Sequence, residues 1–344
     1  MAGRRALRAG AGAASGNGGA GSARRAGGAA GGSAHRALVS ALTTIADDDR
    51  VARAQEAVRE ASAELRWHEA LRRRWREARA EAAIRGAIAS GAIEGALVSA
   101  PELRERVAAG GLDRPLSGDP SLDAVAGIWR AGARLAGFMA DLRGQSRPAE
   151  PSPRSLLTSL HRDIAGPLAA SGAIGLDEVA VPRTALPGGT PSSGGTGSAG
   201  EPEALGAAPR EGGPGPAPQG QALAERLDAL LAIIAAPGVP ALVRAAVVHG
   251  EMIAMRPFTA GNAALGRLLV RHLITRDGLE PTGVAVPDAY ARRAPGAYSD
   301  AAAAYARGDA EGVITWTVWQ AEAILVGITE GAELCRAIQA GRAE

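Results

Sequence analysis

The chain has 344 residues, of which 46% are hydrophobic and 3% are aromatic, and its formal net charge at pH 7 is +2. This is enough apolar material for one large domain with a core of small side chains on closely packed helices, so an all-α fold is expected. The single cysteine, Cys335, excludes an intramolecular disulfide, and no run reaches the roughly 18 apolar residues of a membrane helix, so a cytoplasmic protein without membrane contacts is predicted.

Residues 1–34 consist mainly of Gly, Ala, Ser and Arg and show no apolar periodicity. Because such a segment cannot offset its ordering entropy by burying apolar surface, a disordered tail is predicted. The tail holds five arginines and no acidic residue, so the rest of the chain has 33 basic and 36 acidic residues and a net charge of −3. A specific nucleic-acid site on the folded domain is therefore disfavoured, and weak salt-sensitive contacts by the tail are the remaining alternative.

Residues 35–110 are predicted to form N-terminal helices. Apolar residues recur at helical spacing from about residue 50 to residue 89, with dense charges between them, so a long helical stretch is predicted there. The hexapeptide from Ser90 to Gly95, Ser-Gly-Ala-Ile-Glu-Gly, follows this helix.

Residues 111–182 are predicted to form the first part of the main domain. Asp119 and Pro120 have the residue types of an N-cap and a first helical position, and the pattern continues to about residue 142. A further helix is predicted over about residues 155–168. From 183 to 220 the chain is almost entirely Gly, Pro, Ser, Thr and Ala, which predicts a flexible insertion.

Residues 221–344 form the second part of the domain, with helices predicted over about 221–235, 240–255, 262–276 and 310–339. His272 lies among charged residues and is predicted to be at the surface. The short loop between residues 255 and 262 contains the most informative motif in the chain.

The stretch from Arg256 to Arg267 reads Arg-Pro-Phe-Thr-Ala-Gly-Asn-Ala-Ala-Leu-Gly-Arg. It resembles the active-site motif of Fic (Fido) nucleotidyl transferases, His-Pro-Phe-x-Asp/Glu-Gly-Asn-Gly-Arg-x-x-Arg. His249 lies seven residues before Arg256, where the family tends to carry a histidine. The matching positions that fix the register are Pro257, Phe258, Gly261, Asn262 and Arg267. Four functional positions depart from the motif, because Arg256 replaces the base, Ala260 the acidic metal ligand, Ala263 the second glycine and Ala264 the first phosphate-binding arginine.

Ser90, Glu94 and Gly95 resemble the inhibitory-helix motif Ser/Thr-x-x-x-Glu-Gly/Asn of one large class of Fic proteins. In that class the glutamate bonds the closing arginine of the active-site motif, so the resemblance implies an ion pair between Glu94 and Arg267. The alternative is that Glu94 caps or neighbours another helix end. In the family this region holds a short β-hairpin flap, whereas here the low-complexity insertion is predicted to take its place, with residues 179–181 as a remnant.

The departures remove the chemistry that the family requires. A guanidinium at Arg256 cannot accept a proton from a target hydroxyl, and Ala260 offers no ligand to Mg²⁺. No catalytic residue and no metal ligand are therefore predicted, and Mg²⁺ is not expected as a cofactor. The loop still leads into a helix N-terminus, so a nucleotide or phosphate site, with ATP as the candidate ligand, is predicted at Arg256, Gly261, Asn262 and Arg267. The alternative is a plain connection between two helices.

The resemblance thus predicts a degenerate, non-catalytic Fic-like protein with a regulatory role and a nucleotide or phosphate ligand. Two alternatives stay open. One is an active transferase that adenylylates a protein hydroxyl by altered chemistry. The other is an interaction module whose tail and insertion recruit a protein partner.

Overall fold

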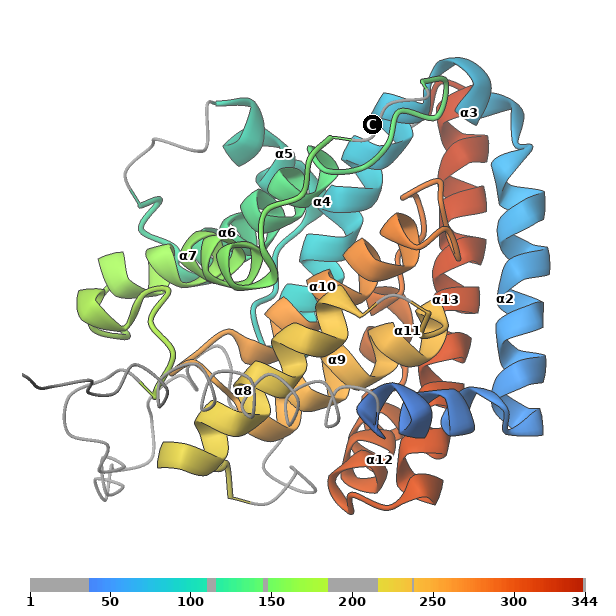
Figure 1. Cartoon of the computed structure of the whole chain (residues 1–344). Coiled ribbons are helices and arrows are strands. Elements are labelled where there is room, and N and C mark those ends of the chain that lie inside the picture. The colour runs from blue at the N-terminus through green and yellow to red at the C-terminus, as the bar shows by residue number, and fades with distance from the viewer. Residues whose placement is uncertain (1–36, 110–115, 145–147, 185–215, 237, 343–344) are drawn as a thin grey trace, which may run out of the picture.

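A computed structural model of the chain describes residues 37–109, 116–144, 148–184, 216–236 and 238–342, and every regular element in these ranges is helical (Figure 1). The predicted all-α fold is confirmed. The predicted tail, 1–34, lies outside the described residues, as does most of the predicted insertion, of which 183–184 and 216–220 are described.

A first helix covers Ala37–Ala46. The helices that follow are α2 (Asp49–Arg66), α3 (Glu69–Arg73), α4 (Trp75–Ile93), α5 (Ala100–Ala108), α6 (Pro120–Ala136), α7 (Pro153–Ala170), the 3₁₀ turn η1 (Leu176–Glu178), α8 (Gly220–Ala235), α9 (Ala241–Met255), α10 (Asn262–Arg276), α11 (Asp288–Arg293), α12 (Pro295–Ala306) and α13 (Ala310–Gln339).

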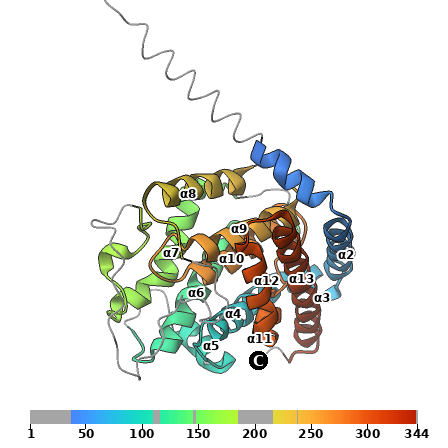
Figure 2. The ribbon, with the colours of Figure 1, turned by 90° about the horizontal axis from the view of Figure 1, so that it is seen from below.

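The helices α9 and α10 form the centre of the molecule, and almost all of their residues are buried. They pack on each other, with α6 and α7 on one side and α4, α12 and α13 around the other (Figures 1 and 2). A Cβ on Gly266 would lie 2.8 Å from Cδ2 of His249 and 3.1 Å from Cβ of Met252. Glycine at 266 therefore allows the close approach of the two central helices.

By length and composition alone, the 30-residue helix α13 could cross a membrane. It is the one helix in the described ranges of which this is true. However, 61% of its most apolar window is buried, and it contacts α2, α4, α9, α11 and α12. Trp316 on this helix is fully buried, and its indole N–H donates to the carbonyl of Ala246 at 2.6 Å. The helix thus serves as part of the core of this fold.

The stretch predicted to be helical over about residues 50–89 is helical, but it is divided into three helices. These are α2, α3 and α4, which pass along one side of α13, over its C-terminal end and back along another side (Figure 1). The breaks fall at Trp67 and Arg74, and the imidazole of His68 caps α3 by accepting the N–H of Ala70 at 3.2 Å. A single straight helix could not contact both sides of α13.

Other differences are smaller. The helix that begins after Asp119 is confirmed, with Asp119 as N-cap, but it ends at Ala136 rather than near residue 142. Three helices, α5, α11 and α12, were not predicted as elements, although a capping box between Ser99 and Glu102 marks the start of α5. His272 was predicted at the surface but is buried.

Candidate functional site

The motif loop connects α9 to α10 and is shaped by two residues with left-handed backbone conformation. Arg256 caps α9 with φ 46° and ψ 65°, and its N–H donates to the carbonyl of Met252 at 3.1 Å. Gly261 precedes α10 with φ 72°. Glycine adopts this conformation without steric cost, whereas at Arg256 it costs about 1–2 kcal/mol that the surrounding contacts must offset.

Asn262 closes the loop with its side chain. The Oδ1 atom accepts the N–H of Phe258 at 2.9 Å, and Nδ2 donates to the carbonyl of Phe258 at 2.9 Å. Both residues are almost completely buried. The asparagine of the motif therefore determines the loop conformation, with its amide oxygen and its amide nitrogen both bonded to Phe258.

His161 on α7 contacts the motif loop through hydrogen bonds and ring stacking. Its Nδ1 accepts the N–H of Ala180 at 2.9 Å, so Nε2 carries the proton and donates to the carbonyl of Ala260 at 3.1 Å. The ring stacks on Phe258 with centroids 3.9 Å apart and an interplanar angle of 11°. Burial lowers the pKa of His161 to about 4, although the hydrogen bond to Ala260 acts in the opposite direction. His161 is thus a neutral structural histidine at physiological pH.

The position of the missing acid is filled by packing. Ala260 is 4% exposed and belongs to a small apolar cluster with Ala124 and Leu168. Ala264, at the position of the first phosphate-binding arginine, is also fully buried. Within the described ranges, no group of three or more His, Cys, Asp and Glu side chains is placed to hold a metal ion.

Arg183 holds the loop to the segment that follows α7, a role that no motif in the sequence indicates. Its Nε donates to the carbonyl of Arg256 at 2.7 Å, and its Nη2 donates to those of Met255 at 3.0 Å and Pro218 at 3.3 Å. The backbone N–H of Arg183 donates to the carbonyl of Pro257 at 2.8 Å. Arg183 was predicted to belong to the flexible insertion, but it is anchored to the motif loop. Residues 179–181, the expected remnant of the flap, have no regular secondary structure.

Replacement of Arg183 by Ala should reduce the free energy of unfolding by about 1–3 kcal/mol, because two carbonyls at the end of α9 and that of Pro218 lose a charged donor. Arg183→Lys keeps the charge but not the forked donor geometry, so it should recover less than half of this loss. Urea unfolding measures both. The exposed Arg59→Ala on α2 is the control and should change stability by less than about 0.5 kcal/mol. A neutral Arg183→Ala would contradict this role.

The predicted ion pair between Glu94 and Arg267 is present. Nη2 of Arg267 lies 2.5 Å from Oε1 of Glu94, and the two side chains are 4% and 6% exposed. Ser90 contributes twice, because its hydroxyl accepts from Nε of Arg267 at 2.9 Å and its carbonyl accepts from Nη2 at 3.2 Å. Gly95 follows the helix with φ 85°, a conformation that favours glycine.

Arg267 has two further partners, the Oδ1 of Asp288 at 3.4 Å and the hydroxyl of Tyr298 at 3.5 Å. Burial acts to lower the pKa of Arg267, but the charges of Glu94, Tyr298 and Asp288 outweigh it, and the pKa is raised. Burial also raises the pKa of Asp288, against the opposing effect of Arg267. The cation is therefore firmly held between two carboxyl groups.

His249 is a core histidine, as the sequence predicted. Nδ1 lies 2.9 Å from Oε1 of Gln320 and Nε2 lies 3.2 Å from the hydroxyl of Tyr298, and the ring packs against Trp316. Burial lowers its pKa to about 3. With no exposed surface, it cannot meet a substrate hydroxyl.

The sequence matches no known family profile, and no curated protein resembles it closely enough to be matched. Solved structures do match. A Fic family protein from Desulfovibrio desulfuricans G20 is 18% identical, with a TM-score of 0.55 over 81% of this chain and 74% of that one. A Fic-1 fragment from C. elegans is 17% identical, with a TM-score of 0.55 over 84% and 73%. A Fic domain containing signaling protein from Bacteroides thetaiotaomicron VPI-5482 is 14% identical, with a TM-score of 0.51 over 83% and 98%. The chain therefore has the Fic fold, as the motif loop predicted.

Proposed function

We propose that this chain is a non-catalytic protein of the Fic fold, with a regulatory or binding role in place of nucleotidyl transfer. The packing of Ala260 carries the proposal. Where the motif of the active proteins has an acid that faces the metal and the phosphates, this chain has a methyl group buried against Leu168 and Ala124. That position can neither bind Mg²⁺ nor neutralise a transferring phosphate.

The absence of a usable base supports the same proposal. Arg256 is half-buried, and although burial lowers the pKa of its guanidinium, arginine remains a cation at physiological pH. His161 and His249 are committed to hydrogen bonds in the interior. A general base must reach the proton that it abstracts, directly or through one water molecule, and neither histidine can.

Nucleotide or phosphate binding without transfer is the second part of the proposal. The backbone N–H groups at the start of α10 and the guanidinium of Arg256 favour an anion at this end of the helix. Of the loop residues between 256 and 263, Arg256, Thr259 and Ala263 retain exposed surface. Because Arg267 is occupied by Glu94, Ser90 and Tyr298, it would not contact the ligand in this conformation. We expect weak binding of ATP that does not depend on Mg²⁺.

The purified chain should transfer no detectable adenylyl group to itself or to lysate proteins with Mg-ATP, as measured by label incorporation and intact mass. Glu94→Gly, which removes the ion pair with Arg267, should be equally inactive, since neither a base nor an acid is present at the motif positions. Arg256→His alone should also fail, because Ala260 and Ala264 leave the metal and phosphates unheld. A Fic protein with an intact motif is the positive control. Labelled product at its level from the unmodified chain would establish the alternative of altered chemistry.

Thermal shift with ATP, with and without Mg²⁺, tests the binding part. A saturable rise in Tm that is lost in Arg256→Ala and unaffected by Mg²⁺ is expected. If Tm does not change at millimolar ATP, the motif loop is only a connection between two helices, and the alternative of an interaction module is favoured.

A further inference from the structure

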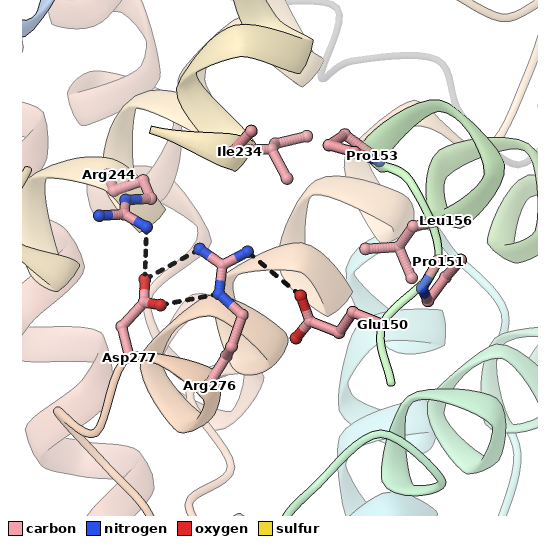
Figure 3. A pocket seen from close by; sticks show the side chains of 9 residues that line it. Glu150, Pro151, Pro153, Leu156, Ile234, Arg244, Arg276 and Asp277 are labelled. Atoms are coloured by element: carbon pink, nitrogen blue, oxygen red, sulfur yellow. Dashed lines mark hydrogen bonds and ion pairs between the residues drawn. The ribbon is translucent and has the colours of Figure 1, made fainter. Parts of the chain in front are cut away.

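A cavity of about 350 Å³ lies between the start of α9 and the ends of α8 and α10 (Figure 3). Its charged side chains are paired with one another. Oδ2 of Asp277 lies 3.1 Å from Nη1 of Arg244, and its Oδ1 lies 2.7 Å from Nε of Arg276. Oε2 of Glu150 lies 3.6 Å from Nη1 of Arg276. Two arginines and two acids have no net charge, so these charges already neutralise one another. The opposite situation occurs where α2, α3 and α13 meet.

The C-terminal ends of α2 and α13 lie beside the short helix α3 at one corner of the molecule (Figure 1). The guanidinium of Arg74, which follows α3, donates to the carbonyl of Ile338 in the last turn of α13. The guanidinium of Arg143, in the segment after α6, donates to the carbonyl of Arg72 on α3. These contacts bring together residues 64–77, 141–144 and 333–342, and we call the surface that they form the basic end.

The basic end has an excess of positive charge. It contains eight arginines and five acidic residues, which gives a net charge of +3. The chain outside the basic end and outside residues 1–34 has 25 basic and 31 acidic residues, a net charge of −6. The charge is therefore distributed unevenly along the chain, and the basic end attracts anions.

Most of this positive charge is not paired. Three ion pairs are present in the basic end, Glu69 with Arg72, Glu77 with Arg74 and Asp141 with Arg76. The other arginines form no ion pair within the described ranges, and all are exposed: Arg66, Arg73, Arg143, Arg336 and Arg342. The two remaining acids, Glu64 and Glu333, are exposed as well. Five unpaired cations thus stand against two unpaired anions.

An accessible aromatic ring lies among these charges. Trp67 is 73% exposed, and every other aromatic side chain in the described ranges is buried or half-buried. It follows Arg66 directly and ends α2, where its N–H donates to the carbonyls of Glu64 and Leu65. A tryptophan ring is a large apolar surface, and at this position it is left in contact with water. The basic end therefore offers both unpaired positive charge and apolar surface.

We propose that the basic end binds the surface of a membrane that contains anionic lipids. The unpaired arginines would contact headgroup phosphates, and the ring of Trp67 would enter the interfacial layer, where tryptophan is enriched in membrane proteins. The net negative charge of the remainder of the chain would be repelled by the same lipids, which orients the basic end towards them. Contact of this kind is peripheral and requires no spanning helix.

The shape of the basic end favours a membrane over a nucleic acid. A single strand of nucleic acid also binds arginines and aromatic rings, but it is held along a positively charged groove. Figure 1 shows α3 and the ends of α2 and α13 at a projecting corner of the molecule. A projecting corner can meet a flat lipid surface without a groove.

Sedimentation of the full chain with vesicles tests the proposal. Vesicles of equimolar phosphatidylcholine and phosphatidylglycerol should bind the chain at least about tenfold more tightly than pure phosphatidylcholine, and added salt should weaken the binding. Lipids with brominated acyl chains should quench the fluorescence of the unmodified chain but not that of Trp67→Phe, since Trp67 is the exposed tryptophan of the described ranges. Absence of binding, or quenching that persists in Trp67→Phe, would overturn the proposal.

Matched variants separate the basic end from the basic residues of the segment 1–34. The double variant Arg66→Gln/Arg73→Gln should weaken binding to the anionic vesicles by at least about tenfold. Arg4→Gln/Arg5→Gln removes the same charge from the N-terminal segment and should weaken it by less than about threefold. Equal losses in the two double variants would mean that net charge alone attracts the chain, which would contradict a site at the basic end.

The contribution of the ring has its own control. Trp67→Ala should weaken vesicle binding several-fold, whereas Leu176→Ala, which removes an equally exposed apolar side chain elsewhere, should leave it unchanged. All the replaced side chains that the structure describes are exposed, and circular dichroism checks that each variant folds. Binding of oligothymidylate that depends on Trp67, without binding of vesicles, would assign the basic end to nucleic acid instead. The proposed nucleotide site shares no residue with the basic end, so the result is independent of the proposed function.

Discussion

Arg267→Ala is expected to reduce the free energy of unfolding by about 3–5 kcal/mol, because it leaves buried carboxyl groups without their cation. Glu94 and Asp288 both lie against this guanidinium, so both acids lose a cationic partner when it is removed. Glu94→Ala should cost less, since Arg267 keeps Ser90, Asp288 and Tyr298 as partners. Urea unfolding at pH 7 measures each change.

The double variant should be less destabilised than the sum of the two single variants, with a coupling of about 0.5–3 kcal/mol. The exposed pair of Glu56 and Arg59 on α2 is the control cycle and should give a coupling below about 0.5 kcal/mol. Additive effects at Glu94 and Arg267 would mean that the pair contributes nothing specific to the stability of the fold.

Stability is expected to fall as the pH is lowered from about 6.5 towards 4, in part because His161 must remain neutral in the fold. Its folded pKa of about 4 is below the value of 6.5 expected for an unfolded chain. In this window the unfolded chain binds more protons than the folded one, so the free energy of unfolding rises with pH. The full contribution, about 3 kcal/mol for a shift of this size, is present above pH 6.5 and lost as the pH falls through both values.

Carboxylates and the buried His249, whose pKa is lowered to about 3, contribute in the same window, so the contribution of His161 has to be isolated. His161→Gln should have a slope of unfolding free energy against pH that is smaller by about 1.4 kcal/mol per pH unit between pH 4.5 and 6. Arg59→Ala should keep the slope of the unmodified chain. NMR titration gives an independent reading without a variant, and a histidine signal of His161 that titrates near pH 6.5 would contradict the structural role assigned to it.

The features that the sequence predicted best are those marked by particular side chains, in a motif or at a helix cap. The motif predicted the loop between α9 and α10, and the resemblance of Ser90 and Glu94 to the inhibitory helix predicted a contact with Arg267 across 173 positions, which the structure contains. Asp119 likewise predicted the start of α6, since a cap has a local chemical signature. Whether these residues bind a nucleotide or inhibit anything stays a prediction.

The sequence predicted least well the contacts between a side chain and the backbone, and the helices whose composition is uniform. Arg183 binds carbonyl groups, which every residue has, and it stands at the edge of a low-complexity stretch. The alanine-rich α12 has no clear apolar stripe, so periodicity could not reveal it. The break at Trp67 depends on the position of α13, which is distant in the sequence. Each of these features requires the tertiary structure.

The burial of Ala260 has an evolutionary consequence. A single substitution to Asp or Glu at this position would place a carboxylate against Leu168 and Ala124, and burying an unpaired charge costs several kcal/mol. The stability loss would come at once, whereas any activity would need a base at 256 and an arginine at 264 as well. A variant with this single substitution would therefore lose stability without gaining activity. The packing of this one methyl group therefore opposes the gain of a carboxylate in the motif loop by a single substitution.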